Sequence, residues 1–435
     1  MIFALIVVPV LGLFFGVHRY LWCRLIRDTT APGGRARRAG TVAALALPLL
    51  ALAALLAGRL GAPFVLQQVL AWPGYLWLAL VLYLVLALLA GEAVRAVWLA
   101  VWPRVAPARR PEPAAIGAPD PAPPATSTSS PSSPSSPSSP SSPPTPTLLP
   151  PHTPALPPLP APPRRLFVAR AVAAGASLAA VATVGYGTAT TLRGPRVKRV
   201  TVPLAKLPRA AHGFRIAVVS DIHLGPVLGR AHTRRIVDTI NRTRPDLVAI
   251  VGDLVDGSVP DLGPAAEPLR ALESRYGSYF VTGNHEYYSG AAQWVDHVRE
   301  LGVHPLENAR TELPGFDLAG INDLAGESEH AGPDYGRALG GRDTARAVVL
   351  LAHQPVTIHD TARHGVDLQL SGHTHGGQMW PVTYLAAATN PTVAGLARYG
   401  DTQLYVTRGA GAWGPPVRVG APPDVTVVEL ASLRA

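Results

Sequence analysis

The sequence has almost no cysteine and little charge. Cys23 is the single cysteine in 435 residues, which excludes an intrachain disulfide framework and a cysteine-based zinc site. Charged residues make up only 15% of the chain, whereas soluble domains carry about 25%. Because 48% of the residues are hydrophobic, part of this chain is expected to lie in lipid.

Acidic residues are nearly absent from the first 199 positions, where four stand against 18 Lys and Arg. The remaining residues carry 20 basic and 24 acidic side chains, so the basic excess does not indicate a nucleic-acid partner for the C-terminal half. Four uncharged apolar runs occupy residues 1–17, 41–57, 72–91 and 171–192. A membrane-spanning helix needs about 20 such residues, and these runs therefore predict four spans.

The arginines predict the orientation of these spans. Residues 18–40 contain six arginines, residues 58–71 contain only Arg59, and four more arginines lie between residues 92 and 110. Positively charged loops stay in the cytoplasm, so loops 18–40 and 92–165 are predicted to be cytoplasmic. The chain after residue 192 is then expected on the non-cytoplasmic face of the cell membrane, as part of a multi-pass protein.

Composition divides the chain into four parts. Residues 1–106 are predicted to form a membrane region with three spans, residues 166–199 a fourth span with a juxtamembrane segment, and residues 200–435 a soluble domain. Residues 107–165, with repeated Ser-Ser-Pro units, predict a disordered linker because they contain few apolar side chains. The linker ends at Arg164-Arg165, which resembles an internal twin-arginine export signal or serves simply as a topology signal.

The C-terminal half has the pattern of an α/β domain. Short apolar runs predict strands buried on both faces, and amphipathic stretches predict helices at 231–243, 291–301 and 356–364. The predicted strands cover residues 215–220, 247–251, 279–282, 318–321, 348–352, 368–370, 404–407 and 425–430.

Polar side chains follow five of these strands, where α/β sheets bind their ligands. They are Asp221 and His223, Asp253 and Asp256, Asn284 and His285, His353, and His373 and His375. Imidazole and carboxylate together suit Zn, Fe or Mn better than Mg or Ca. A central carboxylate can bridge two ions, and Asp253 is the natural candidate for that position.

These clusters resemble the calcineurin-like metallophosphoesterase superfamily across residues 213–430. The resemblance implies a four-layer α/β/β/α sandwich and two divalent metal ions, Mn, Fe or Zn. One metal would be held by Asp221, His223, Asp253 and His375, and the second by Asp253, Asn284, His353 and His373. The resemblance also implies that His285 protonates the leaving group or stabilises the transition state, and that Asp256 orients it.

Residues 371–378, 408–411 and 415–418 resemble the membrane-anchored bacterial branch of this superfamily. That resemblance implies hydrolysis of phosphate mono- or diesters by a hydroxide that bridges the metals. Phospholipids and lipid-linked cell-envelope phosphoesters are among the implied substrates, with the bilayer as a partner.

Two other classes of function compete with this interpretation. One is a membrane signalling or transport protein that binds metal without catalysis, although the spans lack the internal charges of a substrate pathway. The other is a nuclease, which the acidic C-terminal half disfavours. Arg418 is a candidate for contact with a substrate phosphate, or else a structural arginine.

Overall fold

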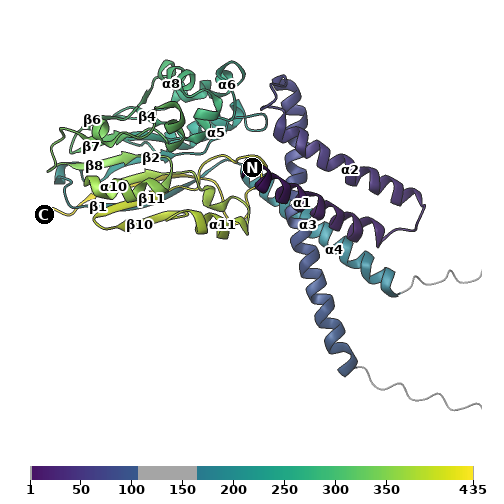
Figure 1. Cartoon of the computed structure of the whole chain (residues 1–435). Helices are drawn as coiled ribbons and strands as arrows, with labels where there is room; N and C mark the ends of the chain where they lie inside the picture. The colour runs from purple at the N-terminus through teal and green to yellow at the C-terminus, as the bar shows by residue number, and fades with distance from the viewer. Residues whose placement is uncertain (1, 106–163, 435) are drawn as a thin grey trace, which may run out of the picture.

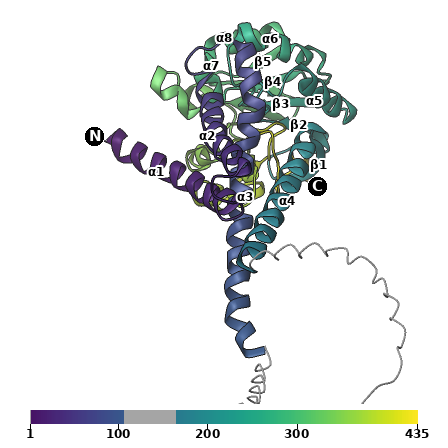
Figure 2. The same cartoon turned by 90° about the vertical axis from the view of Figure 1, so that its right-hand side faces the viewer.

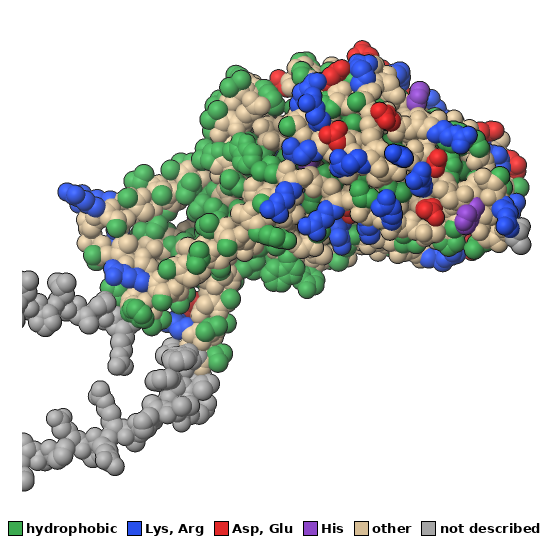
Figure 3. Space-filling view, turned by 180° about the vertical axis from the view of Figure 1, so that it is seen from behind, with side chains coloured by type: hydrophobic (Ala, Val, Ile, Leu, Met, Phe, Trp, Pro, Cys, Tyr) green, Lys and Arg blue, Asp and Glu red, His purple; other side chains and the backbone are tan. Residues whose placement is uncertain are grey.

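The structure is a computed structural model that describes residues 2–105 and 164–434. It consists of long N-terminal helices and a domain with two β-sheets (Figure 1). The predicted linker at 107–165 lies outside the described residues except for its last two positions, which begin a helix. Charged side chains gather over the two-sheet domain, while the helices present mainly hydrophobic ones (Figure 3).

The N-terminal region is mainly helical in its described part. It contains α1 (Ile2–Trp22), a π-helical turn (Cys23–Arg27), α2 (Arg35–Leu56), α3 (Phe64–Val105) and α4 (Arg164–Leu192). Among the described residues, three segments are long and apolar enough to cross a membrane: Arg35–Leu56, Phe64–Val97 and Leu166–Leu192. They coincide with the second, third and fourth predicted runs. The first run falls in α1, which is not one of the three, and its role as a span stays a prediction.

Contacts join the helices to one another at one level and to the two-sheet domain at another, while the start of α1 and the end of α3 stand apart (Figure 2). Away from the two-sheet domain, Arg24 Nη2 lies 3.2 Å from Glu92 Oε1, and Arg170 Nε donates to Thr29 O at 3.0 Å. At the opposite end, Phe64 of α3 packs on the two-sheet domain. The loop between α2 and α3 therefore lies at the same end of the helices as the domain, as the arginine pattern requires. Which side of the membrane this is stays a prediction.

Each sheet of the domain has six strands. The first sheet has the order β1-β12-β2-β3-β4-β5 and the second the order β10-β11-β9-β8-β7-β6. The strands are β1 (Arg196–Leu204), β2 (Phe214–Val219), β3 (Leu247–Val251), β4 (Ser278–Val281), β5 (Val303–Pro305), β6 (Ala309–Leu313), β7 (Phe316–Gly320), β8 (Ala347–Leu351), β9 (Leu368–Ser371), β10 (Gly395–Tyr399), β11 (Thr402–Val406) and β12 (Asp424–Ser432).

The two sheets pack face to face, and helices cover their outer faces. Ile216 and Phe316 belong to the core between the sheets, where both are fully buried. On the outer face of the first sheet, Ile236 and Trp294 pack from helices, and Ile358 packs on the outer face of the second. The predicted α/β/β/α sandwich is confirmed. Its helices are α5 (Arg230–Arg242), α6 (Val259–Ala266), α7 (Asn284–Ser289), α8 (Ala291–Glu300), α9 (Tyr335–Leu339), α10 (Ile358–Thr361) and α11 (Val382–Thr389).

The eight predicted strands correspond to β2, β3, β4, β7, β8, β9, β11 and β12. The edge strands β1, β5, β6 and β10 were not predicted. Strand β1 begins at Arg196 and runs parallel to β12, so it crosses the boundary predicted at residue 200. The first sheet therefore starts only four residues after α4 ends.

Candidate metal centre

The seven predicted metal ligands lie together at one edge of the sandwich. Asp221 and His223 follow β2, Asp253 follows β3, and Asn284 begins α7 three positions after the end of β4. The second sheet contributes the others, because His353 follows β8, and His373 and His375 follow β9. Parallel strands place their carboxyl ends at the same edge, and here both sheets present that edge to one site.

Asp221, His223 and His375 form the first group of potential ligands. One donor atom from each lies within 4.8 Å of the others. The Nε2 atoms of His223 and His375 are 3.0 Å apart, and His375 Nε2 lies 3.4 Å from Asp221 Oδ1. Asp253 Oδ2 is 3.7 Å from His223 Nε2, so Asp253 lies next to this group as well.

Asp253, His353 and His373 form the second group, again with donor atoms within 4.8 Å of one another. The ring of His353 is fixed because its Nδ1 lies 2.8 Å from Val251 O, where it can only donate. Its Nε2 faces the Asp253 carboxylate and lies 3.1 Å from Oδ2. Although burial opposes it, the charge of Asp253 holds the pKa of His353 well above its usual value. A positive charge is therefore favoured between these two atoms, as a proton on Nε2 or as a metal ion.

Three buried atoms support a cation at this second group. Within the described residues, His353 Nε2, His373 Nδ1 and Asn284 Oδ1 have no hydrogen-bond partner. Buried polar atoms in folded proteins nearly always have one. All three atoms belong to predicted ligands of the second metal, so the side chains present fit the ion that the sequence predicts.

Carboxylate and neutral imidazole are the forms that bind metal. The site favours them at Asp253, His373 and His375. At His223, by contrast, although burial opposes it, the neighbouring carboxylates raise the pKa to about 9. Burial lowers the pKa of His373 to about 4 and holds the pKa of His375 well below its usual value. Burial opposes ionisation of Asp253, but the neighbouring His353 and His223 outweigh it and hold the pKa of Asp253 well below its usual range.

The backbone around the ligands has an unusual conformation. Five of the seven predicted ligands have left-handed φ angles: Asp221 (51°), His223 (48°), Asp253 (53°), His373 (72°) and His375 (52°). Neighbouring glycines give these turns room, since a Cβ on Gly283 would lie 2.9 Å from the His353 ring and would also collide with the Asp253 carboxylate. These side chains converge because the chain turns sharply after β2, β3 and β9.

His285 and Asp256 lie beside the first group. His285 Nδ1 is 2.6 Å from Asp256 Oδ1, and the same oxygen is 2.9 Å from His223 Nδ1. Although burial opposes it, the charge of His223 lowers the pKa of Asp256 to about 2. The His285 side chain is 15% exposed. Its ring nitrogen also lies within 4.8 Å of donor atoms of His223 and Asp253, so a ligand role is the alternative to the predicted acid.

Glu286 has a positional role that the sequence did not reveal. Its buried carboxylate accepts hydrogen bonds from the backbone N–H groups of Asp253 at 3.0 Å, Leu254 at 2.8 Å and Gly283 at 2.6 Å. Burial raises the pKa of Glu286 to about 7. Glu286 therefore fixes the turn that carries Asp253.

Arg418 holds the turn that carries His375. Its guanidinium donates to the backbone oxygens of His375 at 2.9 Å, Arg408 at 2.8 Å and Gly411 at 2.8 Å. Nη2 also lies 3.2 Å from His375 Nδ1. Because Arg418 is 1% exposed, it positions His375, and this geometry disfavours contact with a substrate phosphate.

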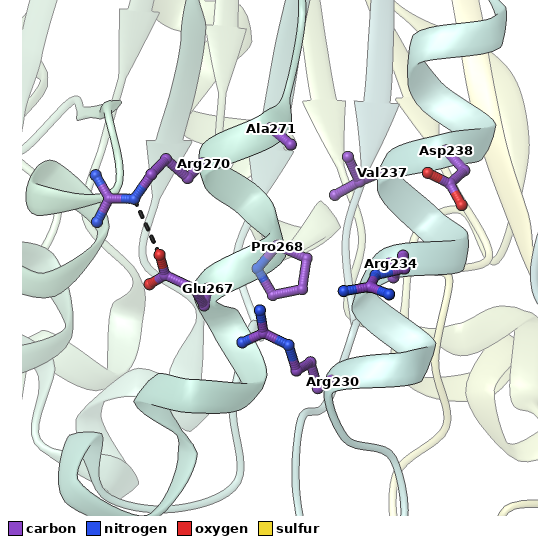
Figure 4. A pocket seen from close by; sticks show the side chains of 8 residues that line it. All are labelled: Arg230, Arg234, Val237, Asp238, Glu267, Pro268, Arg270 and Ala271. Atoms are coloured by element: carbon purple, nitrogen blue, oxygen red, sulfur yellow. Dashed lines mark hydrogen bonds and ion pairs between the residues drawn. The ribbon is translucent and has the colours of Figure 1, made fainter.

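A separate hollow of about 460 Å³ lies between α5 and the 3₁₀ turn Glu267–Ala271 (Figure 4). Arg230, Arg234 and Arg270 line it, and Glu267 pairs with Arg270 at 3.0 Å. None of its lining residues belongs to the metal centre.

Known proteins are similar in sequence to the two-sheet domain. The family model for calcineurin-like phosphoesterases matches residues 214–377. A transmembrane protein with metallophosphoesterase domain from Danio rerio is 41% identical over 259 residues, which are 56% of this chain and 59% of that protein. The uncharacterized metallophosphoesterase YkuE of Bacillus subtilis is 32% identical over 285 residues, which are 62% of this chain and 98% of that protein.

Among solved structures, a dimetal phosphatase from Danio rerio aligns with 51% of this chain and 93% of its own, at a TM-score of 0.37 and 13% identity. The chain spans about three-fifths of the length of the Danio rerio transmembrane relative. The Bacillus subtilis protein is matched over nearly its whole length. The chain therefore belongs to the calcineurin-like metallophosphoesterase family.

Proposed function

We propose that this protein is a membrane-anchored phosphoester hydrolase that binds two divalent cations. The observation that carries the proposal is the set of three buried, unpartnered ligand atoms beside Asp253, with a second group of ligands on the other side of the same carboxylate. The proposed ligands of one cation are Asp221, His223, Asp253 and His375, and those of the other are Asp253, Asn284, His353 and His373.

The chemistry divides between the cations and the side chains. Two bound cations supply an activated water and neutralise charge on the phosphoryl oxygens. His285 protonates the oxygen of the leaving group. Asp256 holds Nδ1 of that ring, so Nε2 is the nitrogen that remains to donate. The mixed imidazole and carboxylate ligands favour Mn, Fe or Zn.

The proposed substrates are phosphate mono- or diesters, and among them phospholipids or lipid-linked cell-envelope phosphoesters. Apolar helices packed directly against the catalytic domain support substrates at a membrane. The alternative is a membrane protein that binds metal for signalling or transport without catalysis.

Metal removal tests this function. The full chain, purified in detergent, is stripped with a chelator and reloaded with Mn²⁺, Fe²⁺ or Zn²⁺, and hydrolysis of nitrophenyl phosphate and bis-nitrophenyl phosphate is measured. We expect hydrolysis to disappear on stripping and to return as two equivalents of metal bind. Metal binding without hydrolysis of either ester would favour the non-catalytic alternative, and hydrolysis that survives stripping would exclude metal catalysis.

We also propose that the catalytic domain lies on the non-cytoplasmic face of the membrane. A phosphatase-type reporter fused after Ala435 should then be active, and a fluorescent reporter that matures only in the cytoplasm should be dark. Fusions after Arg110 provide the control and should show the reverse pattern. A fluorescent C-terminal fusion would reverse the proposed orientation.

A further inference from the structure

A segment next to the metal centre has a surface unsuited to water. Residues 376–397 contain no charged side chain, and helix α11 within them has no buried residue. Tyr384 is 71% exposed, Leu385 66% and Trp380 49%. By contrast, α5 of the same domain carries four arginines. Several exposed apolar side chains on one uncharged segment are typical of an interaction site.

This segment is joined directly to the metal centre. Residues 376 and 377 follow His375, and Thr383 Oγ1 of α11 donates to Gly376 O at 3.2 Å. The backbone of Thr383 fills the space where a side chain on Gly377 would lie. Helix α11 therefore packs on the turn that carries His373 and His375.

The segment is also joined to the candidate spans. Met379 and Val419 pack in one hydrophobic cluster with residues of α3 and α4, and the Trp380 N–H donates to Val419 O at 2.9 Å. The neighbouring Arg418 N–H donates to Gly187 O of α4 at 3.1 Å. Figure 1 shows α11 at the edge of the domain towards these helices.

These contacts relate the depth of α11 to that of the candidate span Leu166–Leu192. The segment Leu166–Leu192 has 27 residues and is about 40 Å long at ~1.5 Å per residue, roughly 10 Å longer than the hydrocarbon core. Gly187 lies five positions before Leu192, about 8 Å from the helix end. It thus lies close to the boundary between acyl chains and headgroups, and α11 begins at the same level.

The apolar surface continues to the leaving-group side of the site. The Gln378 amide bonds to the backbone of Trp413, with Nε2 donating to its oxygen and Oε1 accepting from its N–H, both at 3.0 Å. Trp413 is 56% exposed, and its ring centroid lies 5.7 Å from that of His285. We call Trp380, Tyr384, Leu385 and Trp413 the apolar rim. Trp380 bonds to Val419 of the cluster that includes the spans, and Trp413 lies beside His285.

We propose that the apolar rim lies in the headgroup layer of the bilayer that holds the spans. Tryptophan and tyrosine favour that layer, and an uncharged helix with exposed aliphatic side chains can bury one face at the acyl boundary. This inference rests on the proposed membrane anchoring and catalysis. It also specifies where that catalysis takes place, because the metal centre then opens at the level of the phosphates of membrane lipids.

Depth-dependent fluorescence quenching tests whether the apolar rim lies in the headgroup layer. In a Cys23→Ser background, Leu385→Cys is labelled with an environment-sensitive fluorophore, and the full chain is reconstituted in phosphatidylcholine and phosphatidylglycerol vesicles with or without brominated acyl chains. Glu312→Cys is the matched control, because its side chain is 73% exposed on β6, at the opposite edge of the sheet from β10.

We expect brominated lipid to quench the label at position 385 and leave the label at position 312 unchanged. Equal emission with both lipids at position 385 would overturn the proposal. A label that is shielded from water yet not quenched by bromine would indicate that a second protein copy covers the rim, and this too would overturn it.

The functional consequence is tested with the double variant Tyr384→Ser, Leu385→Ser in the same vesicles. We expect turnover of a phosphoester that carries two acyl chains to fall about tenfold, with hydrolysis of soluble bis-nitrophenyl phosphate unchanged. An equal fall for both substrates would mean that the rim supports the site rather than docks. If the wild-type protein hydrolyses neither substrate, the proposed catalysis fails, while the quenching result still decides the docking.

Discussion

Replacing Asp253 with asparagine is expected to remove bound metal and hydrolysis together. Asp253 Oδ2 lies 3.1 Å from His353 Nε2 and 3.7 Å from His223 Nε2, one histidine from each ligand group. The amide lacks the negative charge that two cations would share. Loss of several kcal/mol of metal-derived stabilisation corresponds to a fall in turnover of about 10³ or more.

The variant keeps most of the local structure, because asparagine retains the oxygen that accepts the His285 N–H at 3.0 Å. Metal content by elemental analysis and turnover of a soluble phosphodiester are measured on the same preparation. Asp261→Asn is the control, since this carboxylate is exposed on α6 and bonds only to Ser258 among the described side chains. A variant of Asp253 with two metals and near-normal turnover would show that Asp253 does not bridge.

Replacing His285 with alanine is expected to preserve both metals and reduce turnover by roughly 10²–10⁴, the usual contribution of a positioned acid. The His285 ring pairs with Asp256 at 2.6 Å, while its backbone N–H bonds to Asp253. Alanine removes the ring and keeps the backbone bond. The variant therefore separates proton transfer from the geometry of the metal ligands.

The defect should depend on the leaving group. Nitrophenolate departs without a proton, so its esters should suffer less than alkyl esters, whose alkoxides need one. His304→Ala provides a histidine control on β5, outside the site. Loss of metal from the His285 variant, or a defect of the same size for all leaving groups, would identify His285 as a ligand or a structural residue.

The sequence predicts the strand-end ligands well because each follows a short, continuously apolar run. It does not predict β1, in which Arg196, Lys198 and Arg199 resemble the basic flank of a membrane span. Only pairing with β12, more than 200 residues away, makes this segment a strand. Likewise, α11 lies in an uncharged stretch whose exposure depends on how the domain packs against α3 and α4.

The two positioning residues show a second limit of sequence reasoning. Glu286 and Arg418 act on backbone atoms, the first on the Asp253 turn and the second on the His375 carbonyl. Residue types can suggest metal ligands, because ligand chemistry is specific to side chains. Backbone groups are the same in every residue, so the sequence does not indicate which of them a buried charged side chain binds. The folded structure is needed to identify that partner.

The left-handed turns of the metal centre have a consequence for the evolution of this fold. A side chain in that conformation costs about 1 kcal/mol or more, and five ligands have it. The total, of order 5 kcal/mol, is comparable to the net stability of a typical domain, roughly 5–15 kcal/mol. Packing of the inter-sheet core must therefore offset the free energy that the turns of the metal centre cost, which leaves less stability to tolerate mutations. Loss of core packing would leave such a centre with little tolerance for further mutation, even where the mutated residue lies far from any ligand.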